Sequence, residues 1–176
     1  MFFPKSIIHL ILFLFIISGS LSLAEDYSDS DITKVVMLGS GNPFPDPERS
    51  GPSVAIIVND VPYLFDAGAG VWQATGAATP KYGGTVKALE SGNISKVFIT
   101  HLHSDHVVGL PSLILLPWAL GREAPLEVWG PPGTENMVKH LTEAYREDVG
   151  SRKYGLGQDN DTGWRAVGHN VPNAGL

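Results

Sequence analysis

The chain has no cysteine among its 176 residues. This excludes disulfide bonds and every zinc site built on thiolates, so any metal must be held by histidine and carboxylate side chains. Positive charge is also scarce, since 12 Lys and Arg stand against 18 Asp and Glu, for a formal net charge of −6. Binding of nucleic acid usually needs a basic face, so we expect no nucleic-acid partner.

The N-terminal apolar run is too short to cross a membrane, which takes roughly 20 residues. It covers residues 7–17 and is interrupted by His9. Lys5 precedes it and the small residues of 18–24 follow it, an order typical of a secretory signal peptide. A retained membrane anchor is the alternative. We expect residues 1–24 to be a cleaved signal peptide, the protein to be secreted or periplasmic, and no stable membrane anchor to remain after cleavage.

Removal of residues 1–24 takes away one basic residue, Lys5, and no acidic one. The mature chain then has 11 basic and 18 acidic side chains, and 11 − 18 gives a net charge of −7. Residues 25–32 are acidic and Ser-rich, and we expect them to form a flexible lead-in. Residues 33–176 have the length of one domain with a hydrophobic core.

Apolar periodicity and turn residues predict the elements of this domain. Strands are expected at residues 33–38, 53–58, 63–65, 96–100 and 126–129, with a hairpin turn at Asn59-Asp60. Helices are expected at residues 71–78, 84–89, 107–120 and 134–149, with no regular pattern beyond Gly150. Strands and helices alternate after an initial run of strands, which indicates an α/β fold with a mixed sheet covered by helices.

Three histidines and one aspartate fall within six positions directly after the strand expected at residues 96–100. In an extended chain His101 and His103 point to the same side, while Asp105 and His106 follow as the backbone turns. Crowded titratable groups need a neutralising partner. We therefore predict that these four residues bind a metal, for which Zn²⁺ suits best and Mn²⁺ or Fe also fits. His140 and His169 are interpreted as ordinary core or surface histidines.

The string HLHSDH at residues 101–106 resembles the HxHxDH signature of the metallo-β-lactamase superfamily. Three other segments resemble the ribonuclease Z and arylsulfatase-like branch, namely LGSGNP at 38–43, FDAGAG at 65–70 and LEVWGP at 126–131. The resemblance spans residues 34–133. It implies the N-terminal half of a four-layer αββα hydrolase with two zinc ions, the first on His101 and His103 and the second on Asp105 and His106.

The resemblance also gives Asp66 a role. It implies that this carboxylate, at the end of its strand, orients metal ligands and bound water, so that Asp66 and Asp105 are the catalytic carboxylates. The alternative is that Asp66 is a turn former at the Gly-rich bend of residues 67–70. Both interpretations stay open at this point.

The implied activity is that of an extracytoplasmic hydrolase, which activates water against a phosphodiester, a sulfate ester or a related small anionic ester. A ribonuclease Z-like endoribonuclease is an alternative that the expected export and the acidic charge disfavour. A non-catalytic metal-binding or interaction module is another. The superfamily's downstream histidines and bridging aspartate have no counterpart after His106. We therefore expect the domain to be incomplete at its C-terminus, and the chain ending at Leu176 to be inactive by itself.

Overall fold

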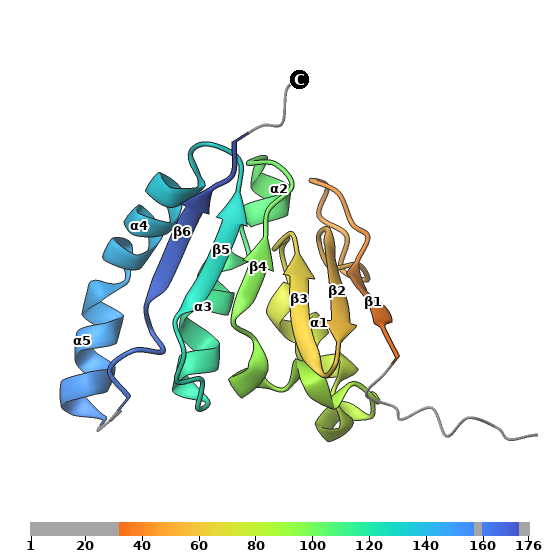
Figure 1. The fold of residues 1–176 in the computed structure, drawn as a ribbon, viewed down its shortest axis with the longest axis horizontal. Coiled ribbons are helices and arrows are strands. Elements are labelled where there is room, and N and C mark those ends of the chain that lie inside the picture. The colour runs from red at the N-terminus through yellow and green to blue at the C-terminus, as the bar shows by residue number, and fades with distance from the viewer. Residues whose placement is uncertain (1–31, 157–159, 173–176) are drawn as a thin grey trace, which may run out of the picture.

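A computed structural model describes residues 32–156 and 160–172. The predicted signal peptide and residues 25–31 of the predicted lead-in lie outside this description. One sheet has the strand order β1-β2-β3-β4-β5-β6 (Figure 1). Its strands are β1 (Lys34–Gly39), β2 (Ser53–Val58), β3 (Val61–Phe65), β4 (Lys96–Phe98), β5 (Leu126–Gly130) and β6 (Ala166–Asn170). The first three pair antiparallel and β3 to β6 pair parallel, which confirms the predicted mixed sheet.

The turn between β2 and β3 is the two-residue hairpin that Asn59 and Asp60 predict. Both residues have a positive φ, 50° and 59°. A type I′ turn requires positive φ at both central positions, and Asn and Asp tolerate it better than most residues. Val58 pairs with Val61 directly across the turn.

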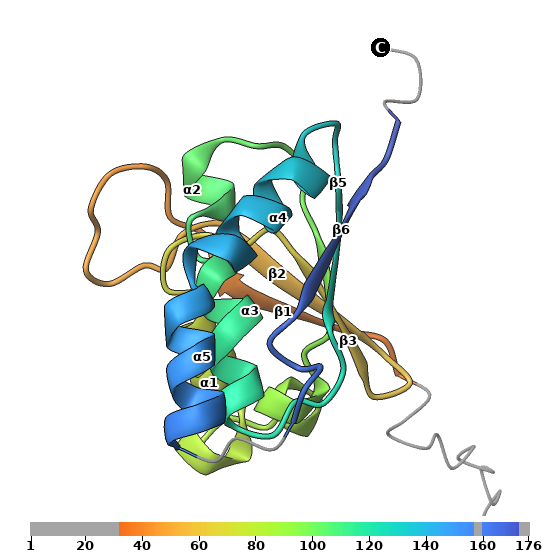
Figure 2. The same ribbon diagram turned by 90° about the vertical axis from the view of Figure 1, so that its left-hand side faces the viewer.

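The helices lie together on one face of the sheet (Figure 2). They are α1 (Val71–Ala78), α2 (Ser104–Val107), α3 (Leu110–Ala119), α4 (Thr134–Ala144) and α5 (Arg146–Gly155), with short 3₁₀ turns η2 (Pro80–Tyr82), η3 (Lys87–Leu89) and η4 (Ser91–Asn93). Within residues 32–156 and 160–172, none of the helices has the length and apolar character needed to span a bilayer.

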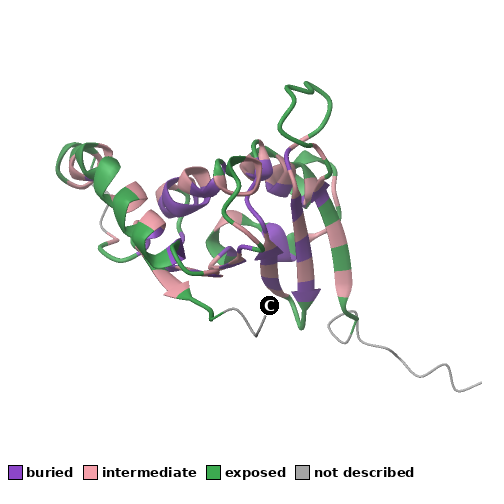
Figure 3. Ribbon diagram, turned by 90° about the horizontal axis from the view of Figure 1, so that it is seen from above, coloured by how far each residue is buried: buried purple, intermediate pink, exposed green. Residues whose placement is uncertain are grey.

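The hydrophobic core lies between this helical layer and the sheet, where the buried residues gather (Figure 3). Alternate strand residues such as Ala55, Leu64 and Val97 point into it, and α3 contributes Leu113 and Trp118. Full burial of one Leu or Val side chain contributes roughly 1.5–3 kcal/mol. The core therefore anchors the central strands and holds their C-terminal ends in place.

The opposite face of the sheet is also apolar. A row of stacked rings crosses four strands, with centroid distances of 5.2 Å from Phe65 to Phe98, 4.9 Å from Phe98 to Trp129 and 5.0 Å from Trp129 to His169. Met37 on β1 is 65% exposed. No helix in the described part of the chain covers this face (Figure 2). A sheet that is apolar on both faces is typical of one placed between two layers, as the αββα expectation requires.

The helix predicted over residues 107–120 begins later than expected, as α3 at Leu110, while Val107 ends the preceding helix α2 and Gly109 lies between the two. The Gly109 N–H donates to the Ala67 carbonyl oxygen at 2.8 Å. A Cβ at Gly109 would lie 2.2 Å from the Gly68 carbonyl oxygen. The helix is interrupted here because the chain packs directly against the loop that follows β3.

Three other predictions need correction in the second half of the chain. The helix predicted over residues 134–149 is divided at Tyr145 into α4 and α5. The helix predicted over residues 84–89 is reduced to the 3₁₀ turn η3. Beyond Gly150, where no regular pattern was expected, α5 continues and β6 pairs along β5 from Leu126↔Ala166 to Gly130↔Asn170. The hydrogen bonds of β5 stabilise β6, whose local sequence has little strand preference.

Candidate functional site

The predicted ligands follow the C-terminal end of β4, and Asp66 follows the C-terminal end of β3. β4 ends at Phe98, and the chain reaches His101 three residues later. His103 is the extended residue before α2, and Asp105 and His106 lie within α2. Asp66 directly follows β3, has a φ of 61°, and donates its backbone N–H to the Phe98 carbonyl oxygen at 2.8 Å. Two neighbouring parallel strands thus deliver these side chains to one edge of the sheet.

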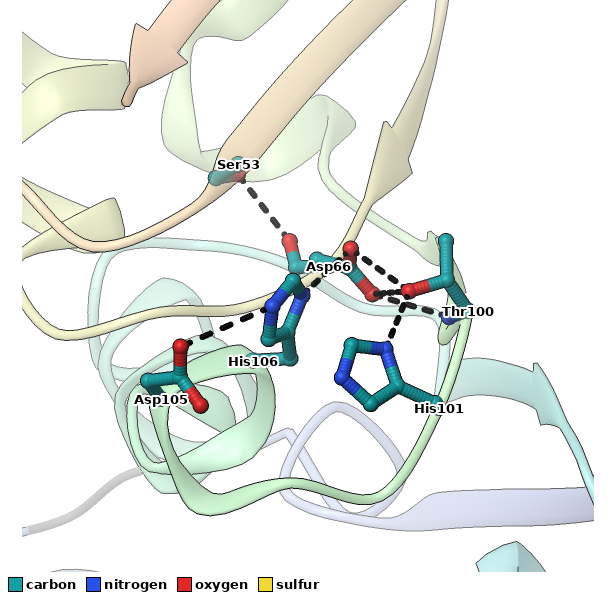
Figure 4. A network of polar contacts seen from close by, with 6 residues as sticks. All are labelled: Ser53, Asp66, Thr100, His101, Asp105 and His106. Atoms are coloured by element: carbon teal, nitrogen blue, oxygen red, sulfur yellow. Dashed lines mark hydrogen bonds and ion pairs between the residues drawn. The ribbon is translucent and has the colours of Figure 1, made fainter. Parts of the chain in front are cut away.

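Asp66 is 7% exposed, and its carboxylate collects donors from two segments (Figure 4). Oδ1 accepts the backbone N–H of Thr100 at 2.8 Å. Oδ2 lies 2.8 Å from Nδ1 of His106, and the Thr100 hydroxyl lies within 3.0 Å of both oxygens. Asp66 therefore has the left-handed backbone conformation of a turn residue, and its carboxylate contacts a predicted ligand. Its role as a catalytic carboxylate that orients ligands and bound water stays a prediction.

The three imidazoles of the motif lie against one another. The ring centroids of His101 and His103 are 4.6 Å apart, and those of His101 and His106 are 4.1 Å apart. Nε2 of His106 lies 3.6 Å from Oδ2 of Asp105. Zinc–donor distances near 2.0–2.2 Å place two donors of one tetrahedral ion about 3.4 Å apart. The Asp105–His106 pair therefore has the spacing of two ligands to a single ion.

The donor set and this pair fit zinc, but the four residues do not form a closed site. Within residues 32–156 and 160–172, no three His, Cys, Asp or Glu side chains are grouped to hold one ion. The assignment of His101 and His103 to a first ion, and of Asp105 and His106 to a second, stays a prediction.

Close backbone contacts fix the loop after β3 against α2. Ala67 donates its N–H to the His106 carbonyl oxygen at 2.7 Å. A Cβ at Gly68 would lie 2.7 Å from the Asp105 carbonyl oxygen and 2.4 Å from the Gly51 carbonyl carbon. Only glycine allows this approach. The Gly-rich bend therefore sets the distance between Asp66 and His106.

An open pocket of about 260 Å³ adjoins Asp105. The loop between β1 and β2, which stands out from the domain in Figure 2, forms one wall with Phe44 and Arg49, and Val108 contributes to the other. Phe44 is 79% exposed, and Arg49 forms an ion pair with Asp46 at 3.3 Å. Asp105 thus lines a pocket at the surface of the domain.

A larger cavity, of about 780 Å³, lies between α1 and the turns η2 to η4. Its lining includes Trp72, Lys81 and Glu90 and none of the four predicted ligands. The larger of these two cavities is therefore not the one beside the predicted ligands.

The two remaining described histidines lie outside the cluster. His140 is exposed on α4. His169 lies on the open face of the sheet, where its ring stacks on Trp129 and its Nε2 contacts Oε2 of Glu127 at 2.5 Å. Sequence reasoning did not single out Thr100, which contacts both Asp66 and His101. The only sequence signal for Thr100 is its position directly before the motif.

Comparison with known sequences identifies the family. The sequence model of the protein family described as anti-Pycsar protein Apyc1 matches residues 33–126, just over half of the chain. Ribonuclease Z of Mycobacterium marinum (strain ATCC BAA-535 / M) is 35% identical over 122 residues. That alignment covers 68% of this chain and 40% of the relative, so the chain spans well under two thirds of the relative's length.

Solved structures agree on the fold. Human tRNase Z, short form, has a TM-score of 0.58 and 25% identity, with 80% of this chain and 46% of that chain covered. The metallo-β-lactamase fold protein YhfI from Bacillus subtilis has a TM-score of 0.50 and 18% identity, with 61% and 42% covered. The second likeness shows the fold alone. Together they confirm the predicted α/β architecture.

These relatives correct the expected partner. A small anionic ester and no nucleic acid were expected, but the relatives are a ribonuclease and a tRNase by name, so that expectation is wrong. Net charge averages over the whole chain, whereas nucleic-acid binding depends on the local field at the contact surface, to which bound cations also contribute. By the match over residues 33–126, the chain belongs to the family of the anti-Pycsar protein Apyc1, within the ribonuclease Z-like part of the metallo-β-lactamase superfamily.

Proposed function

We propose that the protein is a metal-dependent hydrolase that cleaves phosphodiester bonds of RNA at the strand-end histidine cluster. The observation that carries the proposal is the Asp105–His106 spacing of 3.6 Å beside a group of three imidazoles in edge-on and tilted ring contacts. The names of the relatives, ribonuclease Z and tRNase Z, support RNA as the substrate class.

In this proposal His101 and His103 hold one zinc ion, and Asp105 and His106 hold a second. Bound zinc supplies an activated water and a Lewis acid for a phosphoryl oxygen. Asp66 keeps the His106 ring in place through the 2.8 Å contact at Nδ1, which leaves Nε2 directed at Asp105. The pocket beside Asp105 would receive the RNA strand, with the exposed ring of Phe44 available for base stacking.

The experiment compares His103→Ala with the matched variant His140→Ala in the full-length protein. Zinc content is measured by elemental analysis, and cleavage is measured on an in vitro transcribed tRNA and on a chromogenic phosphodiester. His103→Ala should lower zinc content and turnover together, the latter by more than about 100-fold, because loss of a ligand exceeds the 10–100-fold effect of an outer partner. His140→Ala should behave as the wild-type protein does, because His140 lies on an exposed helix face.

Equal losses in the two variants would show that the ligand assignment is wrong. Zinc binding without cleavage of either substrate would favour a non-catalytic metal-binding module. Cleavage of the chromogenic compound but not of the tRNA would retain the hydrolase and overturn RNA as its substrate.

We also propose that the protein is exported. Lys5, the apolar run at residues 7–17 and the small residues up to Ala24 support this proposal. The exported protein should begin at Glu25, as measured by intact mass. A membrane-bound species that retains residues 1–24 would contradict it.

A further inference from the structure

The Thr100 hydroxyl links the Asp66 carboxylate to the first histidine of the motif (Figure 4). Thr100 Oγ1 lies 3.0 Å from Oδ1 and 2.9 Å from Oδ2 of Asp66. The same oxygen lies 3.0 Å from Nδ1 of His101. A single hydroxyl therefore connects the end of β3 with a predicted metal ligand beyond β4.

The chemistry of these groups sets the direction of each hydrogen bond. A carboxylate can only accept, so the Thr100 hydroxyl donates its one proton to Asp66. The Thr100 oxygen then has only lone pairs left for the imidazole. Nδ1 of His101 must therefore carry a proton and donate it to Thr100, which leaves Nε2 of His101 unprotonated.

The same argument applies to His106, which contacts Asp66 directly. Its Nδ1 lies 2.8 Å from Oδ2 of Asp66, so Nδ1 donates to the carboxylate and Nε2 keeps its lone pair. We propose that Thr100 is a positioning residue through which Asp66 selects the tautomer of His101, as Asp66 selects that of His106 directly. Neutral imidazole binds a metal through its unprotonated nitrogen, so both rings present Nε2 as the donor.

The tautomer can be measured without any metal. We would record long-range ¹H–¹⁵N spectra of histidine-labelled, metal-free full-length protein, and assign the His101 signals by their loss in His101→Gln. The wild-type protein and Thr100→Ser should both show His101 protonated at Nδ1. Thr100→Val keeps the shape and removes the hydroxyl, so its His101 should become a mixture of tautomers while His106 stays protonated at Nδ1. Thr142→Val is the matched control, because it removes a threonine hydroxyl that bonds to the Val138 carbonyl oxygen within α4 and to none of the predicted site residues.

The consequence for metal binding rests on the proposed function and is measured separately, by competition with a chromophoric zinc chelator. Thr100→Val should weaken zinc binding by about 10–100-fold, the usual effect of losing a partner behind a metal-bound histidine. Thr100→Ser should restore it, and Thr142→Val should leave it unchanged.

The tautomer spectra and the zinc competition test different claims, so a negative result in one leaves the other claim standing. An unchanged His101 tautomer in Thr100→Val, or a Thr100→Ser protein that matches Thr100→Val, would overturn the role of Thr100. A wild-type protein that binds no zinc, with the tautomer shift present in Thr100→Val, would overturn the proposed function and leave the tautomer inference standing.

Discussion

Two buried charged side chains, Asp66 and Arg122, have partners of opposite kinds. Asp66 is 7% exposed and accepts from Thr100 and from the ring of His106. Arg122 is fully buried and donates to four backbone carbonyl groups. These belong to Ile94, Leu113, Ile114 and Gly163, at 2.5 to 3.2 Å.

Arg122 and Asp66 differ in the kind of group to which they are hydrogen-bonded. The carbonyl groups around Arg122 belong to the segment before β4, to α3 and to the segment before β6, so the guanidinium joins three parts of the backbone. Burial lowers the pKa of Arg122 to about 10, and Arg122 remains a cation at neutral pH. The partners of Asp66 include a side chain that can bind metal. We infer that a buried charge whose partners are backbone groups stabilises the fold. A buried charge whose partner is a metal-binding side chain instead orients that side chain.

The largest expected effect is that of Arg122→Met. It leaves four buried carbonyl groups without their donor, so the free energy of unfolding should fall by roughly 3–5 kcal/mol. Chemical denaturation measures this loss. Zinc affinity per folded molecule should stay that of the wild-type protein, because Arg122 contacts none of the predicted ligands.

Arg146→Met is the control for Arg122→Met. Arg146 is an arginine with a 70% exposed side chain, paired with Glu143 at 3.2 Å. Loss of such a surface pair costs about 0–1 kcal/mol. If both variants lost the same stability, the carbonyl contacts of Arg122 would not carry the stabilisation assigned to them.

The next effect is that of Asp66→Asn, which places an amide where His106 and Thr100 donate. Zinc affinity and turnover should fall by about 10–100-fold. The free energy of unfolding should fall by about 1–3 kcal/mol, since one acceptor is lost at a buried position. Zinc competition and denaturation, measured on the same preparation, separate the two quantities.

Asp60→Asn is a close control for Asp66→Asn, because Asp60 has nearly the same backbone conformation, with φ of 59° against 61° for Asp66. Asp60 is exposed in the β2–β3 turn. It should change neither quantity. Asp60→Asn could instead lower zinc affinity as much as Asp66→Asn does. Zinc affinity would then depend on negative charge anywhere on this sheet and not on the contact between Asp66 and His106.

The sequence predicts those features that are encoded by neighbouring residues. The strand at residues 53–58 and the helix at residues 71–78 have their predicted bounds, because alternation and apolar spacing are local signals. The Asn59-Asp60 turn follows from the preference of two residues. The histidine cluster was found because its four members are adjacent in the chain.

Features that depend on distant partners could not be predicted. Thr100 and Asp66 are 34 positions apart, and Arg122 reaches Gly163 over 41 positions. No residue near Thr100 or Arg122 in the sequence indicates these contacts. The strand β6 was not predicted either, because the strand that stabilises it, β5, lies about 40 residues earlier in the chain.

The smallest expected effect is that of Asn170→Ala. It tests whether the role of a polar side chain depends on its position at this edge of the sheet or on the groups to which it is hydrogen-bonded. Asn170 ends β6 at the same edge of the sheet as Asp66, yet its Oδ1 accepts the backbone N–H groups of Gly133 and Glu135, at 3.1 and 3.2 Å. It thus caps the N-terminus of α4 from a strand 35 residues away. If the partner decides, Asn170→Ala should lower the free energy of unfolding by about 1 kcal/mol, the usual cost of a lost cap, and should leave zinc affinity unchanged.

Asn93→Ala is the control for Asn170→Ala, because Asn93 is an exposed asparagine in η4 whose side chain forms no hydrogen bond with another described residue. Its stability should equal that of the wild-type protein in the same denaturation experiment. A loss of zinc affinity in Asn170→Ala as large as that in Asp66→Asn would show that position at this edge governs function. A residue bonded to backbone amides would then be acting on the metal site, and the kind of partner would not decide what a polar side chain does.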